Sequence, residues 1–215
     1  MPVARSGAPG ILPGGSVVWA WRHPRTRAAQ GLCVGRFDVP VDRRKAKRLA
    51  RRVDRVARAA GLPRIVVTST LQRSAAVGRW LRRWGWVHRR DPALVELDFG
   101  RWEGRCWNDI AREQVDAWCA DFMDHAPGGG ESLRALLKRA AAWQTGEPVV
   151  VIGHAGWMQA RRWLQDGRPG PATAAEWPRS PGHGELQLLS GKRYPRPDDG
   201  GSFASASASC RNCPA

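Results

Sequence analysis

The sequence predicts an α/β fold in which helices cover both faces of a mostly parallel sheet. Short, continuously apolar segments alternate with amphipathic helical segments, and parallel strands buried on both faces have this composition. Hydrophobic residues make up 42% of the chain and charged residues 25%, as in an ordinary globular protein. The 215 residues are enough to bury one large core.

The first half of the chain is expected to form two strand–helix units. Residues 17–21 read as a buried strand, and residues 42–61 place apolar side chains at helical spacing before a Gly-Leu-Pro stop. A second β-branched strand is expected at 64–69, followed by a helix that reaches Trp84.

The second half is expected to continue the alternation. Residues 126–132 form a turn that starts a helix running to about Trp143, with Glu131 in its first turn, where the helix dipole favours an anion. The remaining expected elements are a helix over about 108–121, a strand at 148–156, a helix to about 165 and a last strand at 184–189.

The domain prediction has three parts. Residues 1–15 are a flexible leader without the apolar stretch of a secretion signal, residues 16–189 are the folded domain, and residues 190–215 are a disordered tail rich in Pro, Gly, Ser and Ala. The five cysteines are scattered, and the Cys210–Cys213 pair lies in the tail with no second pair to complete a metal site. No stretch approaches the roughly 20 apolar residues of a membrane span, so we expect a cytoplasmic protein.

The net charge of +16 comes mainly from arginine, since only four residues are lysine. Such a charge attracts nucleic acid or a small anionic substrate. Residues 79–90 interleave tryptophan with arginine, as a groove for single-stranded nucleic acid does. Trp80 and Trp84 are also one helical turn apart, which favours a stripe facing the core. Specific nucleic-acid binding is therefore not expected, although a basic nucleic-acid-binding protein without catalysis stays an alternative.

Polar side chains follow three of the expected strands. Arg22 and His23 end the first, Arg73 lies just beyond Ser69 at the end of the second, and His154 ends the third. Ligands of parallel sheets bind at the carboxyl ends of the strands. These side chains are therefore expected to meet at one edge of the sheet.

This set of side chains fits phosphoryl transfer. Arginine grips phosphate oxygens in a planar, bidentate manner. A neutral imidazole is a nucleophile, and a second imidazole, if protonated, donates a hydrogen bond to the developing charge. A single histidine beside a strand is more often structural, so the prediction of a phosphohistidine intermediate depends on the joint placement of the four residues.

The sequence resembles the histidine phosphatase superfamily, which includes the phosphoglycerate mutases. The similar segments keep the family's order from residue 17 to 189: Arg22-His23, TSTLQRS, LVELDFGRWEG, PGGGES and VIGHAG. The resemblance implies a three-layer α/β/α sandwich of the phosphoglycerate mutase type. It also implies phosphoryl transfer without a metal or other cofactor on a small phosphorylated metabolite.

The resemblance also implies roles for individual residues. His23 would be the nucleophile, and Arg22, Arg73 and His154 would bind the phosphate. His154 would also take part in catalysis, and Glu96 would be the general acid.

Glu96 is preferred as the acid because of its position in the motif, while Asp98 and Glu103 compete with it. An alkoxide leaves poorly unless it is protonated, so the acid must hold its proton near neutral pH. Burial beside an anionic phosphate favours that protonated form. All three carboxylates could instead simply pair with arginines.

Within the superfamily, the segment RHPRTRAAQGLCVGRFDVP looks similar to the α-ribazole phosphatase branch. This branch implies dephosphorylation of α-ribazole 5′-phosphate in cobalamin nucleotide-loop assembly. A phosphatase or mutase of another small phosphorylated metabolite stays open.

Four further positions bear on the site. Thr26 and Arg36 are candidate substrate contacts, although a solvated surface position suits Arg36 equally well. Pro24 stands where the family has glycine and removes a backbone N–H that could face phosphate. Trp102 and Trp157 could line the pocket of a ring-shaped substrate, although buried core positions are the commoner place for tryptophan.

Overall fold

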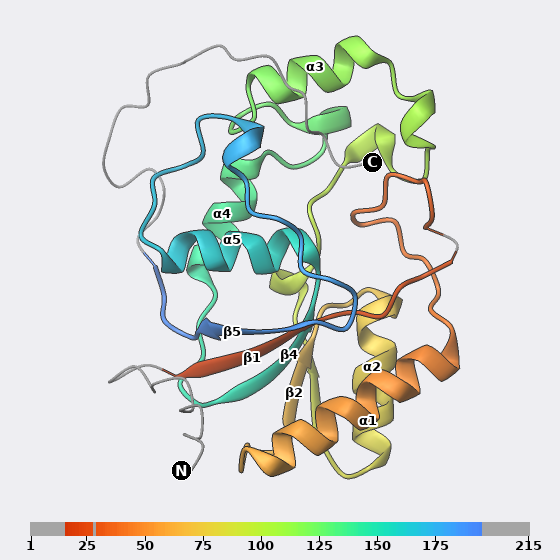
Figure 1. Cartoon of the computed structure of the whole chain (residues 1–215), viewed down its shortest axis with the longest axis vertical. Helices are drawn as coiled ribbons and strands as arrows, with labels where there is room; N and C mark the ends of the chain where they lie inside the picture. Colours follow the sequence, from red (N-terminus) through yellow and green to blue (C-terminus); the bar gives the residue numbers. More distant parts are fainter. Residues whose placement is uncertain (1–15, 28, 195–215) are drawn as a thin grey trace, which may run out of the picture.

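The computed structural model describes residues 16–27 and 29–194, and its centre is a five-stranded sheet (Figure 1). The strands are β1 (Val17–Arg22), β2 (Ile65–Thr68), β3 (Val87–Arg90), β4 (Val149–Gly153) and β5 (Leu186–Ser190). Their order is β3-β2-β4-β1-β5, with β5 antiparallel to β1 and the other neighbours parallel. The prediction of a mostly parallel α/β sheet is confirmed.

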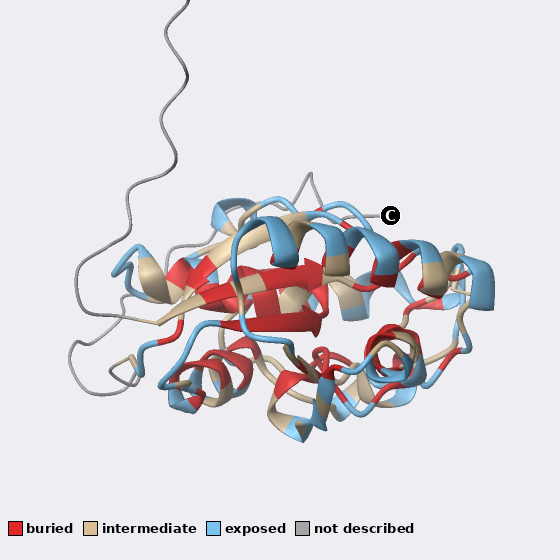
Figure 2. Ribbon diagram, turned by 90° about the horizontal axis from the view of Figure 1, so that it is seen from below, coloured by how far each residue is buried: buried red, intermediate tan, exposed pale blue. Residues whose placement is uncertain are grey.

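Helices cover both faces of the sheet, so the buried strands lie between two outer layers (Figure 2). One layer holds α1 (Arg43–Ala59) and α2 (Gln72–Arg83), and the other holds α4 (Leu133–Ala142) and α5 (Ala155–Gln165). The shorter α3 (Arg112–Ala120) joins the core on the α4–α5 side. The three-layer α/β/α architecture is thereby confirmed.

Local sequence explains the best-predicted elements. The side chain of Asp42 caps α1 by accepting hydrogen bonds from the N–H groups of Arg44 and Lys45, and the apolar stripe of α1 is buried against the sheet. All five residues of β4 are buried, as expected for the central strand of a parallel sheet. The parallel pairing of β4 with β1 and with β2 puts the carboxyl ends of these three strands at one edge.

One strand was not predicted, and two local predictions are wrong. Residues 87–90 form β3, an exposed edge strand that has no apolar run to reveal it in the sequence. The helix expected from 108 divides into a 3₁₀ turn at Trp107–Asp109 and α3. Glu131 precedes the N-cap Ser132 of α4 instead of lying in its first turn.

The folded unit extends past the predicted boundary at residue 189. The buried guanidinium of Arg161 donates hydrogen bonds to the carbonyl oxygens of Ser190 and Lys192, and the N–H of Tyr194 donates to Ala141. These bonds hold residues 190–194 against α4 and α5 because a buried guanidinium needs acceptors. The predictions for the leader and for Cys210 and Cys213 lie outside the described residues.

No helix in the described part of the chain is both long and apolar enough to cross a membrane.

Candidate active site

The site lies at the carboxyl edge of the three central strands. In the register of the sheet, Arg22 of β1 lies opposite Gly153 of β4, and Thr68 of β2 lies opposite Ile152. All three strands therefore end at nearly the same level. The N–H of His23 donates to the Gly153 carbonyl at 3.0 Å, which fixes the first residue after β1 against β4.

His23 is buried and has a defined tautomer. Its Nδ1 lies 2.9 Å from the carbonyl oxygen of Pro24, which can only accept, so Nδ1 carries the proton and Nε2 keeps its lone pair. The Nε–H of Arg73 donates to this Nε2 at 3.3 Å. Burial, and then the positive charge of Arg73, lower the pKa of His23 well below its usual value. The imidazole is therefore neutral, as a nucleophile must be.

Arg73 is held in one orientation. It is 2% exposed, and besides His23 it donates to the carbonyl oxygens of Phe37, at 2.9 Å, and Gly35. Burial lowers the pKa of Arg73, and the nearby Glu96 carboxylate acts against this decrease. The guanidinium thus has no freedom to turn toward solvent.

The loop that holds Arg73 is itself anchored by Glu103. The Glu103 carboxylate accepts hydrogen bonds from the backbone N–H groups of Gly35, Arg36 and Phe37 at 2.7–3.0 Å. Gly35 packs so closely that a Cβ there would overlap the carbonyl oxygen of Leu97. Glu103 therefore acts on the backbone and does not line the cavity beside His23.

The ring of His154 packs against the ring of His23. The two ring centroids are 4.9 Å apart, and His154 Nε2 lies 2.6 Å from the hydroxyl oxygen of Ser69. His154 is fully buried, and burial and then the positive charge of Arg73 lower its pKa well below the usual value. The ring is therefore neutral, and a protonated second imidazole is disfavoured in this pocket.

A cavity of about 400 Å³ opens in front of His23. Its lining includes Arg22, His23, Thr26, Arg73, Glu96 and His183. The structure thus brings together five of the predicted site residues, and the ring of His154 packs against that of His23 without lining the cavity. Burial lowers the pKa of Arg22, and the Arg22 guanidinium donates to the carbonyl oxygen of Pro181 at 2.7 Å.

Glu96 is the one predicted acid that lines this cavity. Its two carboxylate oxygens accept hydrogen bonds from the N–H groups of Leu97 and Gly156, at 3.0 and 3.1 Å. Asp98 instead accepts from the N–H of Gly100 and pairs with Arg36 at 3.4 Å. The carboxyl group of Glu96 is therefore placed to face a ligand bound at His23.

Arg36 does not belong to the cavity. Its guanidinium pairs with Asp98 and, at 3.3 Å, with Glu131. The prediction of Arg36 as a substrate contact is not supported, because two carboxylates already hold its side chain outside the lining.

A second cavity of about 300 Å³ lies on the other side of Glu96. Its lining is mostly apolar and includes the aromatic rings of Phe99, Trp118, Phe122 and Trp177. Trp102 and Trp157, which the sequence suggested as pocket walls, are instead buried in the core on the α4–α5 side. Glu96 therefore separates a cationic cavity from an apolar one.

Sequence reasoning missed His183. Its Nδ1 donates to the backbone carbonyl of His23 at 3.2 Å, and the two ring centroids are 5.3 Å apart. Mainly because of burial, the pKa of His183 is lowered to about 4. β5 runs antiparallel to β1 and therefore begins at the edge where the parallel strands end, a direction that comes from strand pairing and not from a local sequence signal. A histidine just before β5 had to lie near this site.

The fold and this site define a class of protein. A neutral, buried imidazole beside fixed guanidiniums, with one carboxyl group across the cavity, is suited to phosphate ester chemistry, and phosphatases use such an arrangement.

The comparisons identify the family. Residues 18–168 match the model of the histidine phosphatase superfamily (branch 1), and the chain belongs to this superfamily.

Several proteins that are named as phosphatases are similar to this chain in sequence or in fold. It is 28% identical over 156 residues to the adenosylcobalamin/alpha-ribazole phosphatase of Salmonella typhimurium, covering 65% of this chain and 74% of the relative. The alpha-ribazole phosphatase structure from Shigella flexneri shares the fold, with a TM-score of 0.65, 23% identity, and coverage of 84% and 96% of the two chains. A mycobacterial glucosyl-3-phosphoglycerate phosphatase has a TM-score of 0.64, 26% identity, and coverage of 81% and 92%.

Proposed function

We propose that this protein hydrolyses the 5′-phosphate of α-ribazole through a phosphohistidine on His23, without a metal ion. The observation that carries the proposal is the tautomer of His23, whose Nε2 lone pair faces the guanidinium of Arg73 at 3.3 Å. A phosphate held by that guanidinium lies next to the nucleophilic nitrogen.

The reaction takes two steps. His23 Nε2 attacks phosphorus, the P–O bond to the leaving group breaks, and Glu96 gives its proton to the departing oxygen. Water then attacks the phosphohistidine and transfers a proton to the Glu96 carboxylate. Inorganic phosphate leaves, and His23 is regenerated with its lone pair.

The positive charge that the reaction needs comes from the protein. Arg22 and Arg73 would bind the equatorial phosphate oxygens, and His154 would donate a further hydrogen bond. Thr26 lines the same cavity and would contact the substrate through its hydroxyl group. The positive charges of Arg22 and Arg73 in the cavity lining repel a cation, which supports metal independence, and activity should therefore persist in EDTA.

The aromatic cavity beyond Glu96 supports a leaving group with a flat apolar ring. With phosphate at His23, the bond to be broken passes Glu96, and the leaving group extends toward Phe122 and Trp177. The base of α-ribazole is such a ring, and the Salmonella relative acts on this class of compound by its name.

A second candidate is a phosphatase or mutase of another small metabolite, such as a phosphorylated glyceric acid. The similarity to glucosyl-3-phosphoglycerate phosphatase favours it. A polar, acidic leaving group would gain little from aromatic walls, so this candidate ranks second. Either reaction uses a soluble substrate, and we expect the protein to act in the cytoplasm.

The first test traps the intermediate. Brief incubation with labelled substrate should leave an acid-labile, base-stable phosphoenzyme. His23→Ala should abolish the label and lower kcat/KM by about 10³-fold or more, because the nucleophile is lost. His125→Ala, outside the cavity lining, is the control and should behave as the wild type. Wild-type turnover by His23→Ala would disprove the nucleophile.

The second test addresses the substrate. Among phosphorylated metabolites, α-ribazole 5′-phosphate should have the highest kcat/KM, well above 3-phosphoglycerate. Trp177→Ala should lower kcat/KM for α-ribazole phosphate about tenfold and leave 3-phosphoglycerate unchanged, because the removed ring contacts only a ring-bearing leaving group. Equal effects on both substrates would argue against the aromatic cavity as the leaving-group site.

A further inference from the structure

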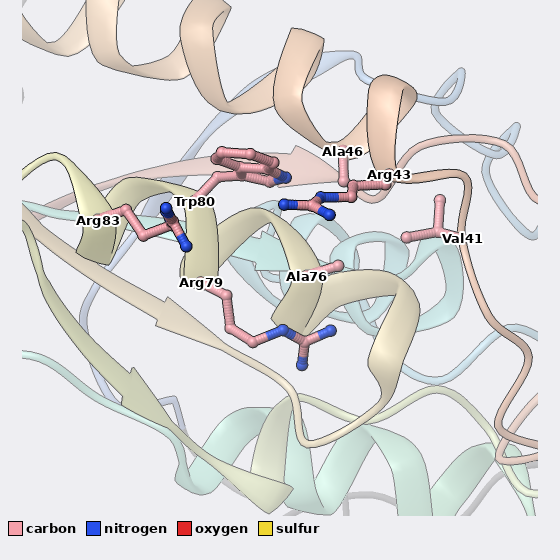
Figure 3. A pocket seen from close by; sticks show the side chains of 7 residues that line it. All are labelled: Val41, Arg43, Ala46, Ala76, Arg79, Trp80 and Arg83. Carbon is pink, nitrogen blue, oxygen red and sulfur yellow. The ribbon is translucent and has the colours of Figure 1, made fainter.

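A third cavity, of about 330 Å³, lies in the groove between α1 and α2 (Figure 3). It shares no lining residue with the cavity in front of His23. Its floor is apolar and consists of Val41, Ala46 and Ala76. Trp80 of α2 forms one wall. This floor and wall offer an apolar surface to a small ring, in a volume typical of small-molecule sites.

The rim of the groove is cationic. Arg43 reaches in from α1, and Arg79 and Arg83 line it from α2 (Figure 3). All three side chains are exposed, and none forms an ion pair with any residue in the described part of the chain. The charge at the rim is therefore not neutralised by a carboxylate of this domain.

Three cationic side chains, two of them from the rim, surround the Trp80 ring. The charged groups of Arg43, Lys47 and Arg83 lie 5.3, 4.9 and 5.6 Å from its centroid. Each cation–π contact contributes only about 0.5–1 kcal/mol at an exposed site. Three like charges around one ring repel one another, so an anion bound among them would relieve the repulsion.

The positive field extends to the neighbouring edge of the sheet. Burial first, and then the charges of Arg90, Arg82 and Arg79, lower the pKa of His88 to about 4. Arginines from α2 and β3 therefore act together on the same side of the molecule, which favours an anion with several negative charges.

We propose that the α1–α2 groove binds a nucleoside triphosphate, with the base against the apolar floor and the phosphates on the arginine rim. Each guanidinium presents a fork of donors that suits two phosphate oxygens, so three arginines match a chain of linked phosphates better than a single phosphate. The apolar floor favours a ligand that also carries a ring, and inorganic polyphosphate has none.

The test measures binding of AMP-PNP, a non-hydrolysable ATP analogue, by isothermal titration calorimetry. The double variant Arg79→Ala/Arg83→Ala should weaken binding at least about tenfold, equivalent to about 1.4 kcal/mol. The control Arg48→Ala/Arg51→Ala removes two exposed charges of α1 outside the groove and should change affinity less than about twofold. Inorganic tripolyphosphate should bind more weakly than AMP-PNP.

Hydrolysis of 4-nitrophenyl phosphate by the Arg79→Ala/Arg83→Ala variant should stay at the wild-type rate, which shows that the fold and the His23 site are intact. Unchanged AMP-PNP binding in that variant would overturn the proposal. Equal losses in both double variants would also overturn it, since they indicate general charge attraction. Binding of a single-stranded oligonucleotide without binding of AMP-PNP would identify a nucleic-acid surface instead.

Discussion

The two ends of α2 carry arginines in opposite physical states. Arg73, in the first turn, is buried and donates to three acceptors, whereas Arg79 and Arg83, further along, are exposed at the rim of an open groove. Arginine therefore has two different roles on one helix. A buried, hydrogen-bonded guanidinium keeps one orientation, while exposed guanidiniums attract an anion without fixing its geometry.

The difference follows from water. Exposed charges interact in a high dielectric and are screened by salt, so each contributes little to a defined geometry. Arg73 is 2% exposed, and three protein acceptors hold its guanidinium in one orientation. A reacting phosphate requires the second situation, because small displacements from the productive position are costly.

The largest expected effect comes from removing the buried guanidinium of Arg73. Arg73→Ala should lower kcat/KM for α-ribazole phosphate by about 10³-fold, because the guanidinium both holds phosphate and contacts His23. Arg73→Lys should recover part of the activity, since it restores the charge without the planar fork. Arg79→Ala, on the same helix, should change kcat/KM less than about twofold. Steady-state kinetics on the three variants decide the matter, and a loss in Arg79→Ala equal to that in Arg73→Ala would refute the contrast.

A smaller effect is expected at the boundary between the cationic and the aromatic cavity. Glu96→Gln keeps an acceptor for the N–H of Gly156 but cannot donate a proton as an acid. Turnover of alkyl phosphates should fall about 10²-fold, while 4-nitrophenyl phosphate, whose leaving group needs no protonation, should lose less than about fivefold. Glu103→Gln is the comparison, and equal losses on both substrates in Glu96→Gln would assign the acid role to another group.

The smallest effect is a shift in the protonation of His23. Because burial and Arg73 oppose the charged form, the neutral nucleophile persists as the pH falls through 6.5, and protonation begins only below that value. A ¹⁵N NMR titration should show this, with the His23 signals assigned by their loss in His23→Ala. Arg22→Gln should move the inflection upward, since it removes a nearby positive charge. An inflection of the wild-type His23 signals at or above pH 6.5 would contradict the electrostatic argument.

Sequence alone located much of the site because the strand ends are local features. His23 and His154 follow short apolar runs that the sequence predicts as buried strands, and their order along the chain matches the family. Glu96 could be chosen over Asp98 and Glu103 only by motif position. The structure adds a physical reason, since Glu96 lines the cavity in front of His23 whereas Asp98 and Glu103 do not.

Other features had no reliable local signal. The edge strand β3 arises from pairing with β2, and its residues, Val87–Arg90, are mostly exposed. His183 reaches the site because β5 runs antiparallel, a direction that the residues of β5 do not encode. The tryptophans of the aromatic cavity and those of the core are the same residue type, so only their three-dimensional neighbours distinguish them.

The sequence by itself determined the layers of the fold, the three strands that end in arginine or histidine, and membership of a phosphoryl-transfer family. Those properties rest on periodicity and on short motifs, which act over a few neighbouring residues. Only the tertiary structure decided which carboxylate faces the nucleophile, which nitrogen of His23 is free, and which arginines are fixed. Orientation and burial depend on contacts between residues distant in the chain, and these exist only once the chain has folded.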